Sequence, residues 1–182
     1  MHHKVNKSLA IGSWKRIVKK FKEVVLKQKE RLEIYTDASY INQHHVGAIC
    51  FIAVKDGQKI HTHVKKMPGK SEVYVLEMTA IVSALKWAIK EYPNTEIEIF
   101  TDSQGAIDAI NGHYKNKSFK KLSRIQDGSI LKTAKYKISH IKAHQNKENF
   151  NDIADRKVRS CARAAAKKIV SKKADVVSEA NK

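Results

Sequence analysis

Two aspartates follow apolar stretches that have the composition of β-strands, and a threonine precedes each of them. Asp37 comes after the stretch from Leu32 to Thr36, and Asp102 follows a second strand-like stretch that begins at Glu96. Because ligands of open α/β sheets bind at the carboxyl ends of the strands, both aspartates are candidate site residues. Each alone also fits a turn or a helix cap, and Asp102 fits a cap especially well.

A third acid, Glu77, falls on the side of a predicted helix that should face the core. Its neighbours at i−4, i+3, i+4 and i+7 are all apolar: Val73, Ala80, Ile81 and Ala84. A carboxylate buried without a partner costs several kcal/mol and tends to take up a proton. A bound cation would reverse that preference, so the position of Glu77 indicates chemistry more strongly than either aspartate does.

The fourth acid, Asp155, falls in the first turn of the last predicted helix, where we expect Asn151 to be the N-cap. Alone, Asp155 fits a favourable contact with the helix dipole. Together with the other three acids, and with no arginine expected beside them, it would form a strongly self-repelling cluster. Mg²⁺ is the usual cation that such oxygen ligands bind. Two ions about 4 Å apart would activate water and stabilise the leaving oxygen of a phosphoryl displacement.

The surrounding pattern predicts which elements position these acids. Period-2 and apolar stretches predict strands at residues 32–36, 46–54, 58–66, 96–100 and 136–141, and Asp56-Gly57 predicts a hairpin between the second and the third. Helical spacing predicts helices at 72–91, 103–111, a segment ending near 133, and 151–173. The order β-β-β-α-β-α-α-β-α predicts an α/β domain with a five-stranded mixed sheet, in which three antiparallel strands precede two parallel ones.

The charge of the chain predicts a polyanionic partner. The 182 residues carry 36 Lys+Arg and 18 Asp+Glu, a net charge of +18, and 42% of them are hydrophobic. Residues 1–31 hold 10 basic and 2 acidic residues, a net +8. We therefore expect nucleic acid to bind, and we expect three segments: a basic extension (1–31), a catalytic domain (32–172) and a polar tail (173–182).

The basic extension has a helical pattern of its own, over residues 13–30. Its apolar stripe includes Trp14 and Phe21, whereas Lys15, Lys19 and Lys22 fall outside that stripe. We interpret these lysines as nucleic-acid contacts that tether the substrate. Two alternatives stay open: the stripe completes the core, or the segment is a mitochondrial presequence.

The sequence lacks the patterns of a cysteine metal site and of a membrane-spanning segment. Cys50 and Cys161 lack the spacing of metal ligands, which favours a reduced protein in the cytoplasm. The longest apolar run, residues 46–54, is too short to span a bilayer, so we expect no membrane association. We also expect a monomer.

Five motifs, in this order, resemble those of type 1 ribonuclease H, over about residues 32–172. They are Tyr35-Thr36-Asp37-Ala38-Ser39, Glu77-Met78-Thr79-Ala80, Thr101-Asp102-Ser103, Lys142-Ala143-His144 and Asn151-Asp152-Ile153-Ala154-Asp155. The resemblance implies an endoribonuclease that hydrolyses the RNA strand of RNA–DNA hybrids and leaves 5′-phosphate and 3′-hydroxyl ends. It also implies two Mg²⁺ ions, with Mn²⁺ as a substitute, held by Asp37, Glu77, Asp102 and Asp155.

The same resemblance implies roles for residues outside the acid cluster. His144 would aid proton transfer or product release. The lysines Lys115, Lys117, Lys120 and Lys121 match the family's basic protrusion in position, and we expect them to contact the duplex together with Ser39 and Asn42. Two rival interpretations remain: a binding module without catalysis, and another nuclease or strand-transfer enzyme on the same fold.

The chain departs from the family pattern in two places. Ala38 stands where the family usually has glycine after its first catalytic aspartate. Residues 73–76 are Val-Tyr-Val-Leu, where the family commonly has an Asn pair that reads the RNA 2′-hydroxyls. We expect backbone groups, and Asn42 with Gln43, to supply that recognition.

Overall fold

The computed structural model describes residues 30–111, 125, 127–142 and 149–180. The chain divides between Glu30 and Arg31, and the fold below is that of the second unit, Arg31–Lys182. Several predicted features lie outside the described residues: the helix at 13–30 with Lys15, Lys19 and Lys22, the lysines Lys115, Lys117, Lys120 and Lys121, and His144.

The predicted five-stranded mixed sheet is confirmed, with the spatial order β3-β2-β1-β4-β5. The strands are β1 (Arg31–Ile41), β2 (Val46–Lys55), β3 (Gln58–Pro68), β4 (Glu96–Thr101) and β5 (Lys137–His140). β1 pairs antiparallel with β2, which pairs antiparallel with β3, whereas β1–β4 and β4–β5 are parallel pairs. The helices are α2 (Val73–Glu91), α3 (Gln104–Ile110), α5 (Ile130–Thr133) and α6 (Phe150–Ala180).

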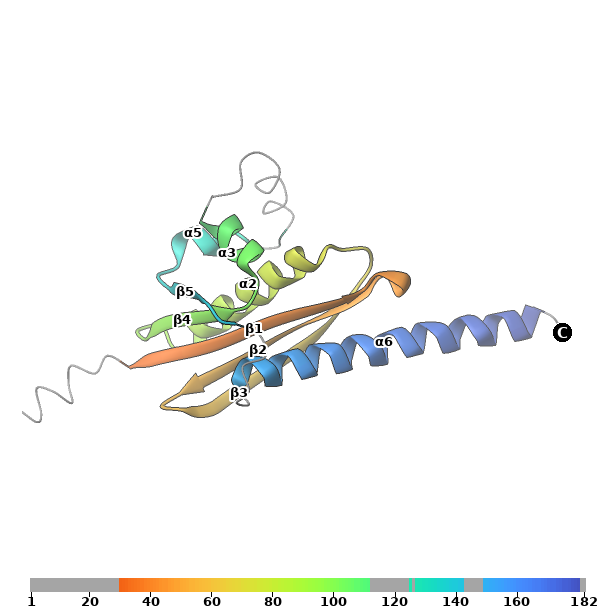
Figure 1. The fold of residues 1–182 in the computed structure, drawn as a ribbon, viewed down its shortest axis with the longest axis horizontal. Helices are drawn as coiled ribbons and strands as arrows, with labels where there is room; N and C mark the ends of the chain where they lie inside the picture. The colour runs from red at the N-terminus through yellow and green to blue at the C-terminus, as the bar shows by residue number, and fades with distance from the viewer. Residues whose placement is uncertain (1–29, 112–124, 126, 143–148, 181–182) are drawn as a thin grey trace, which may run out of the picture. The chain divides into compact units, whose positions relative to one another are not determined.

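The two long helices pack on opposite faces of the sheet, with β2 between them (Figure 1). Phe51 and Ala53 of β2 pack in the cluster formed with α2. Cys50 and Ile52, which point the other way, pack against Ala154, Val158 and Ala162 of α6. This two-sided burial explains why β2 is a nearly continuous apolar run rather than an alternating one.

The hairpin between β2 and β3 has the geometry that its sequence predicts. Asp56 and Gly57 have φ angles of 52° and 73°, so both central residues are left-handed, as in a type I′ turn.

Gly47, near the start of β2, lies in close contact with helix α2 and with the backbone of β1. A Cβ there would lie 2.6 Å from both Leu76 Cδ1 and the Ser39 carbonyl oxygen, so only glycine lets the first turn of α2 rest on β1 and β2.

Two elements extend five or more residues past their predicted ends. β1 continues five residues past Thr36 to Ile41, because its antiparallel ladder with β2 runs through Ile41↔Val46. α6 begins one residue before Asn151 and continues to Ala180, past the predicted end at Lys173. In Figure 1 the last part of α6 runs beyond the end of the sheet.

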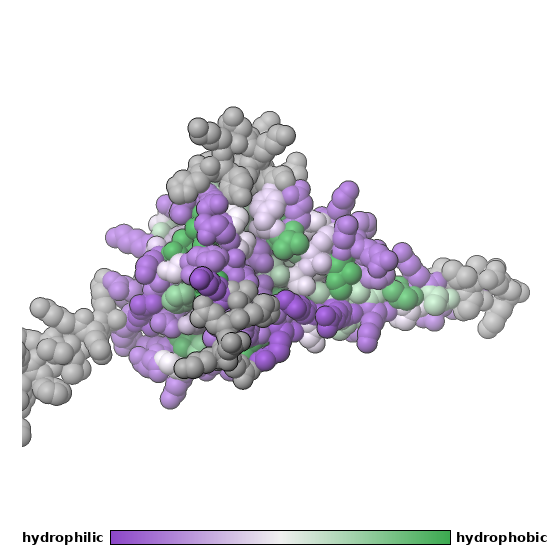
Figure 2. Space-filling view, viewed as in Figure 1, coloured by the Kyte–Doolittle hydropathy of each residue, from purple (hydrophilic) through white to green (hydrophobic). Residues whose placement is uncertain are grey.

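The surface in the view of Figure 2 is mostly hydrophilic, and hydrophobic residues appear on it as separate spots. The exposed large hydrophobic residues of the described chain are scattered over β3, α2 and α6: Ile60, Val64, Val73, Ile89 and Val170. Within the described residues, no helix is both long and apolar enough to cross a membrane.

Candidate active site

Three of the four predicted acids come together at one edge of the sheet. Asp37, Glu77 and Asp102 each offer a carboxylate oxygen, and these three oxygens all lie within 4.8 Å of one another. They come from three different elements: strand β1, helix α2 and the loop between β4 and α3. Glu77 and Asp102 follow Asp37 by 40 and 65 positions in the chain, and the fold brings the three into one cluster.

Asp37 lies inside β1, so the prediction that it ends a strand is wrong. The parallel ladder between β1 and β4 ends at Tyr35↔Phe100, while the antiparallel ladder with β2 continues through Asp37↔Cys50. Asp37 is therefore at the place where β4 diverges from β1. Ligands of open α/β sheets bind where neighbouring strands part in this way.

Glu77 lies in the first half of α2 on its sheet-facing side, as its apolar neighbours predict. Its side chain is 5% exposed, and Ala80, Ile81 and Ala84 on the same side are fully buried. Val73 is an exception, because it is 49% exposed at the start of the helix. The tight contact of Leu76 with Gly47 holds this turn of α2 against the sheet and so positions Glu77.

Asp102 is not the cap of α3. Ser103 takes that role, because its Oγ accepts a hydrogen bond from the Ala106 N–H at 3.2 Å. The cap interpretation of Asp102 is therefore wrong, and its half-buried carboxylate belongs to the cluster instead. Ser103 directly follows Asp102, so the sequence offers two candidate caps and cannot by itself decide between them.

The cluster raises the pKa of its buried members. Burial, the Asp102 charge and the Asp155 charge raise the pKa of Asp37 to about 7, although a hydrogen bond from the Ala38 N–H (2.6 Å) opposes this rise. Burial, Asp37 and Asp102 raise the pKa of Glu77 well above its usual value. Without a cation, the cluster thus holds protons that ordinary carboxyl groups would have lost.

Two oxygen atoms of the cluster show that its donor set suits a cation. Asp37 Oδ2 and Glu77 Oε2 are buried, and neither has a hydrogen-bond partner in the described structure. Buried acceptors without donors are costly, and divalent cations bind such carboxylate oxygens directly. The residues present therefore fit a hard divalent ion.

The fourth acid, Asp155, lies at the start of α6 on the border of this cluster. Its charge contributes to the raised pKa of Asp37, but its oxygens are outside the group of three. Arg159, one turn further along α6, donates from its Nε to Asp155 Oδ1 at 2.5 Å. The expectation that no arginine lies beside the acids is therefore wrong, and the Asp-x-x-x-Arg spacing is the signal that could have revealed it.

The N-terminus of α6 is capped by Asn149 rather than by Asn151. The Asp152 N–H donates to Asn149 Oδ1 at 3.0 Å, and the Asn149 N–H donates to Asp152 Oδ2 at 3.3 Å. This reciprocal pair is a capping box, and it places the cap two residues earlier than predicted. Asn151 instead lies within the helix and is 2% exposed.

One residue beside Asp102 was not predicted as a site residue from the sequence. His140, the last residue of β5, has its Nε2 atom 3.2 Å from the backbone carbonyl oxygen of Asp102. The ring bridges the ends of β4 and β5, which pair in parallel through Thr101↔His140. In the sequence, His140 is marked only by its place near the end of the strand predicted at 136–141.

The other predicted contact residues within the described structure, Ser39 and Asn42, lie on β1 and in the turn that follows it. Ser39 is half-buried on β1, two residues after Asp37, so both side chains are on the same face of the sheet. Asn42 is exposed in the short 3₁₀ turn Asn42–His44 between β1 and β2, and it is not part of the carboxylate cluster.

Comparison with known proteins shows which chains share this fold. The family model for RNase H matches residues 29–163. RNase H1 from Halobacterium salinarum superposes with a TM-score of 0.59 at 20% identity, covering 71% of this chain and 95% of that one. LC11-RNase H1, solved in complex with an RNA/DNA hybrid, gives a TM-score of 0.59 at 20% identity, covering 74% and 98%.

A third solved structure extends this similarity to another source. The N-terminal RNase H domain of a Mycobacterium tuberculosis protein gives a TM-score of 0.62 at 17% identity, covering 76% of this chain and 98% of that domain. No curated protein matches the chain by sequence. At these identities the structural matches establish the fold.

Proposed function

The chain belongs to the RNase H family, and we propose that it is an endoribonuclease that hydrolyses the RNA strand of RNA–DNA hybrids. The observation that carries the proposal is the cluster of Asp37, Glu77 and Asp102, whose oxygens lie within 4.8 Å of one another. The complex of LC11-RNase H1 with an RNA/DNA hybrid supports the choice of substrate. The net charge of +18 favours a polyanionic substrate in general.

We further propose that Asp37, Glu77, Asp102 and Asp155 hold two Mg²⁺ ions, with Mn²⁺ as a substitute. When bound, such ions stabilise the charge that develops on the phosphate and lower the pKa of water. The chain's part is to bring three carboxylates together and to place the charge of Asp155 near Asp37. The buried Asp37 and Glu77 provide oxygens that lack other partners in the described structure, whereas Asp102 and Asp155 are only half-buried.

The proposed products are 5′-phosphate and 3′-hydroxyl ends. His144 is proposed to move a proton at the reacting oxygen or to help release the phosphate product. A group with either role affects turnover more than substrate binding. His144→Ala should therefore lower kcat and leave KM nearly unchanged. A large rise in KM at constant kcat would instead make His144 a binding residue.

Recognition of the RNA strand is proposed to depend on the shape of the hybrid and on backbone groups. The Ala38 N–H already lies at the cluster, where it donates to Asp37. The positions at which the family has its Asn pair are apolar here, and Leu76 is buried against Gly47. Ser39 and Asn42, at the β1–β2 end of the sheet, are the polar side chains proposed to contact the substrate.

Substrate comparison tests the proposal. Labelled RNA–DNA hybrid, duplex RNA, duplex DNA and single-stranded RNA are incubated with the full chain in Mg²⁺, and the products are mapped at nucleotide resolution. We expect internal cleavage of the RNA strand in the hybrid alone. Equal rates on duplex DNA and hybrid would favour another nuclease on this fold, and no cleavage of any substrate would favour a binding module.

A further inference from the structure

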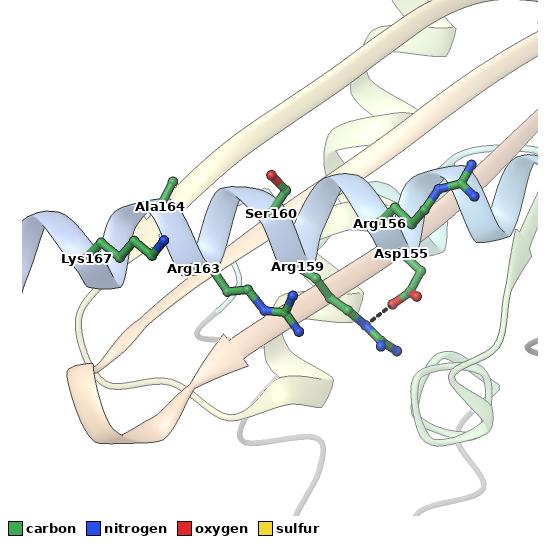
Figure 3. A pocket seen from close by; sticks show the side chains of 7 residues that line it. All are labelled: Asp155, Arg156, Arg159, Ser160, Arg163, Ala164 and Lys167. Carbon is green, nitrogen blue, oxygen red and sulfur yellow. Dashed lines mark ion pairs between the residues drawn. The ribbon is translucent and has the colours of Figure 1, made fainter.

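Three cations and one acid follow each other along one side of α6 at intervals of four residues. They are Asp155, Arg159, Arg163 and Lys167. Figure 3 shows Asp155, Arg159 and Arg163 on one edge of the helix, with Ser160 and Ala164 on the opposite edge. A shallow groove of about 490 Å³ lies along this part of the helix. Its lining consists of all six residues just named together with Arg156. That size is within the range of ligand sites, about 300–1,000 Å³.

The groove has a strong positive charge that begins directly beside the carboxylate cluster. Residues 156–174 contain 8 Lys or Arg and no Asp or Glu. Arg159 is paired with Asp155. Within the described part of the chain, Arg163 and Lys167 form no ion pair, whereas Arg31, Lys86 and Lys137 all do. Arg163 and Lys167 are thus exposed cations whose charge no carboxylate of the described chain neutralises.

The opposite side of the helix fixes the groove in place. Val158 and Ala162 are fully buried against β2, and further along Ala165 and Ala166 pack with Val46. α6 is therefore anchored to the sheet over the whole length of the groove. A row of cations on an anchored helix has a fixed distance and direction from the acids, unlike lysines on a loop.

The dimensions of the row match a nucleic-acid backbone. Arg159 and Lys167 are eight positions apart, which is about 12 Å along the helix at a rise of 1.5 Å per residue. Successive phosphates of one strand advance about 3.4 Å along a duplex axis, so the row spans roughly three to four phosphates. Lys167 also lies beyond residue 163, where the match to the family model ends.

We propose that Arg159, Arg163 and Lys167 form a binding site for the backbone phosphates of the substrate duplex on one side of the scissile bond. The identity of that duplex rests on the proposed function, but the phosphate site does not depend on cleavage. The site adds phosphate contacts at a fixed distance from the acids, so it sets the register of the duplex on the enzyme.

A pair of double variants with equal charge change tests the site. The test variant is Arg163→Gln/Lys167→Gln. The control is Lys157→Gln/Lys168→Gln, which removes two exposed lysines from the same helix. Lys157 and Lys168 are 11 residues apart and therefore share one face, and neither lines the groove. Binding of an RNA–DNA hybrid is measured by fluorescence anisotropy over a range of KCl concentrations in EDTA, so that no substrate is consumed.

We expect the test variant to flatten the plot of log affinity against log salt by about 1.8 units, since each phosphate contact contributes about 0.9. The control should change the slope by less than about half a unit and leave hybrid cleavage in Mg²⁺ unchanged. Equal slope changes in the two variants, or none in the test variant, would overturn the phosphate site. Absence of cleavage by the wild-type chain would refute the proposed function alone, because the slopes would still report on the groove.

Discussion

Arg159 Nε lies 2.5 Å from Asp155 Oδ1, so the acid that lies outside the group of three is held by a cation of its own helix. The same guanidinium also acts at a distance, because its charge lowers the pKa of Asp37. Arg159 thus partly neutralises a cluster that would otherwise carry only negative charge. It also occupies an oxygen of Asp155 that we propose as a metal ligand.

Replacing Arg159 by Gln should therefore have opposite effects on two kinds of binding. Mg²⁺ should bind more tightly to the free protein, because it no longer competes with a cation for Asp155. The hybrid should bind more weakly, because one phosphate contact is lost. Isothermal titration with Mg²⁺ and anisotropy with the hybrid measure the two effects. Arg159→Lys is the matched control that keeps the charge, and a loss of affinity for both ligands in Arg159→Gln would contradict this role.

The raised pKa of Asp37 predicts a stability that falls with pH when metal is absent. Between its ordinary value of 3.8 and about 7, the folded state holds a proton that the unfolded chain has lost, so unfolding becomes easier as pH rises through this range. At pH 8 in EDTA, Asp37→Asn should be more stable than wild type by at most about 4 kcal/mol. At pH 4 the difference should disappear.

Thermal melts at pH 4 and pH 8 in EDTA measure this effect, and Asp56→Asn in the β2–β3 hairpin is the control for the chemical change itself. Mg²⁺ should raise the Tm of wild type at pH 8, because it binds the folded state alone. The same addition should raise the Tm of Asp37→Asn much less. A Tm of Asp37→Asn that is below that of wild type at pH 8 in EDTA would contradict the burial argument.

Gly47 is predicted to support the site from a distance. A Cβ at this position would lie 2.6 Å from the Ser39 carbonyl oxygen, a backbone atom that cannot move aside cheaply, and equally close to Leu76. Gly47→Ala should lower the free energy of unfolding by about 1–3 kcal/mol. It should also lower kcat, since Leu76 directly precedes Glu77. Denaturant unfolding and hybrid cleavage test this, and a variant with wild-type stability would show that α2 can shift without cost.

The first 30 residues are predicted to tether nucleic acid rather than to complete the catalytic domain. Deleting residues 1–30 should leave kcat nearly unchanged and raise KM at moderate salt. The salt slope of hybrid affinity should fall by about two to five units, because this segment contains nine of the chain's cations. A lower Tm or an insoluble product would favour core packing by Trp14 and Phe21. A stable deletion with an unchanged salt slope would favour a targeting segment.

The sequence predicted what depends on periodicity and burial. The core-facing side of α2 identified Glu77, the continuous apolar run identified β2 as buried on both faces, and Asp56-Gly57 identified the hairpin. Features that depend on competition between neighbouring groups could not be predicted in this way. Ser103 caps α3 in place of the expected Asp102, and Asn149 caps α6 in place of the expected Asn151. Each replacement has a similar capping tendency, so residue type alone does not decide between such neighbours.

The length of β1 shows a second limit of sequence patterns. Asp37 and Ser39 interrupt the apolar pattern and suggest that the strand has ended, but pairing with β2 continues as far as Ile41. A polar residue is tolerated inside that strand because β4 has already diverged and the site opens beside it. The departure from the pattern is therefore located at the residues that we propose for the site.

The central claim, that the acid cluster hydrolyses RNA in a hybrid with the help of divalent cations, is tested most directly by one comparison. Hybrid cleavage is measured in Mg²⁺ for wild type, Asp102→Asn and the control Asp56→Asn. Asp102 belongs to the carboxylate cluster, and Asp56 is exposed in the hairpin, where Asn-Gly is an equally suitable turn. We expect turnover by Asp102→Asn to fall at least about 100-fold, while Asp56→Asn keeps the wild-type rate. Near wild-type cleavage by Asp102→Asn, or wild-type cleavage that persists in EDTA, would contradict the claim.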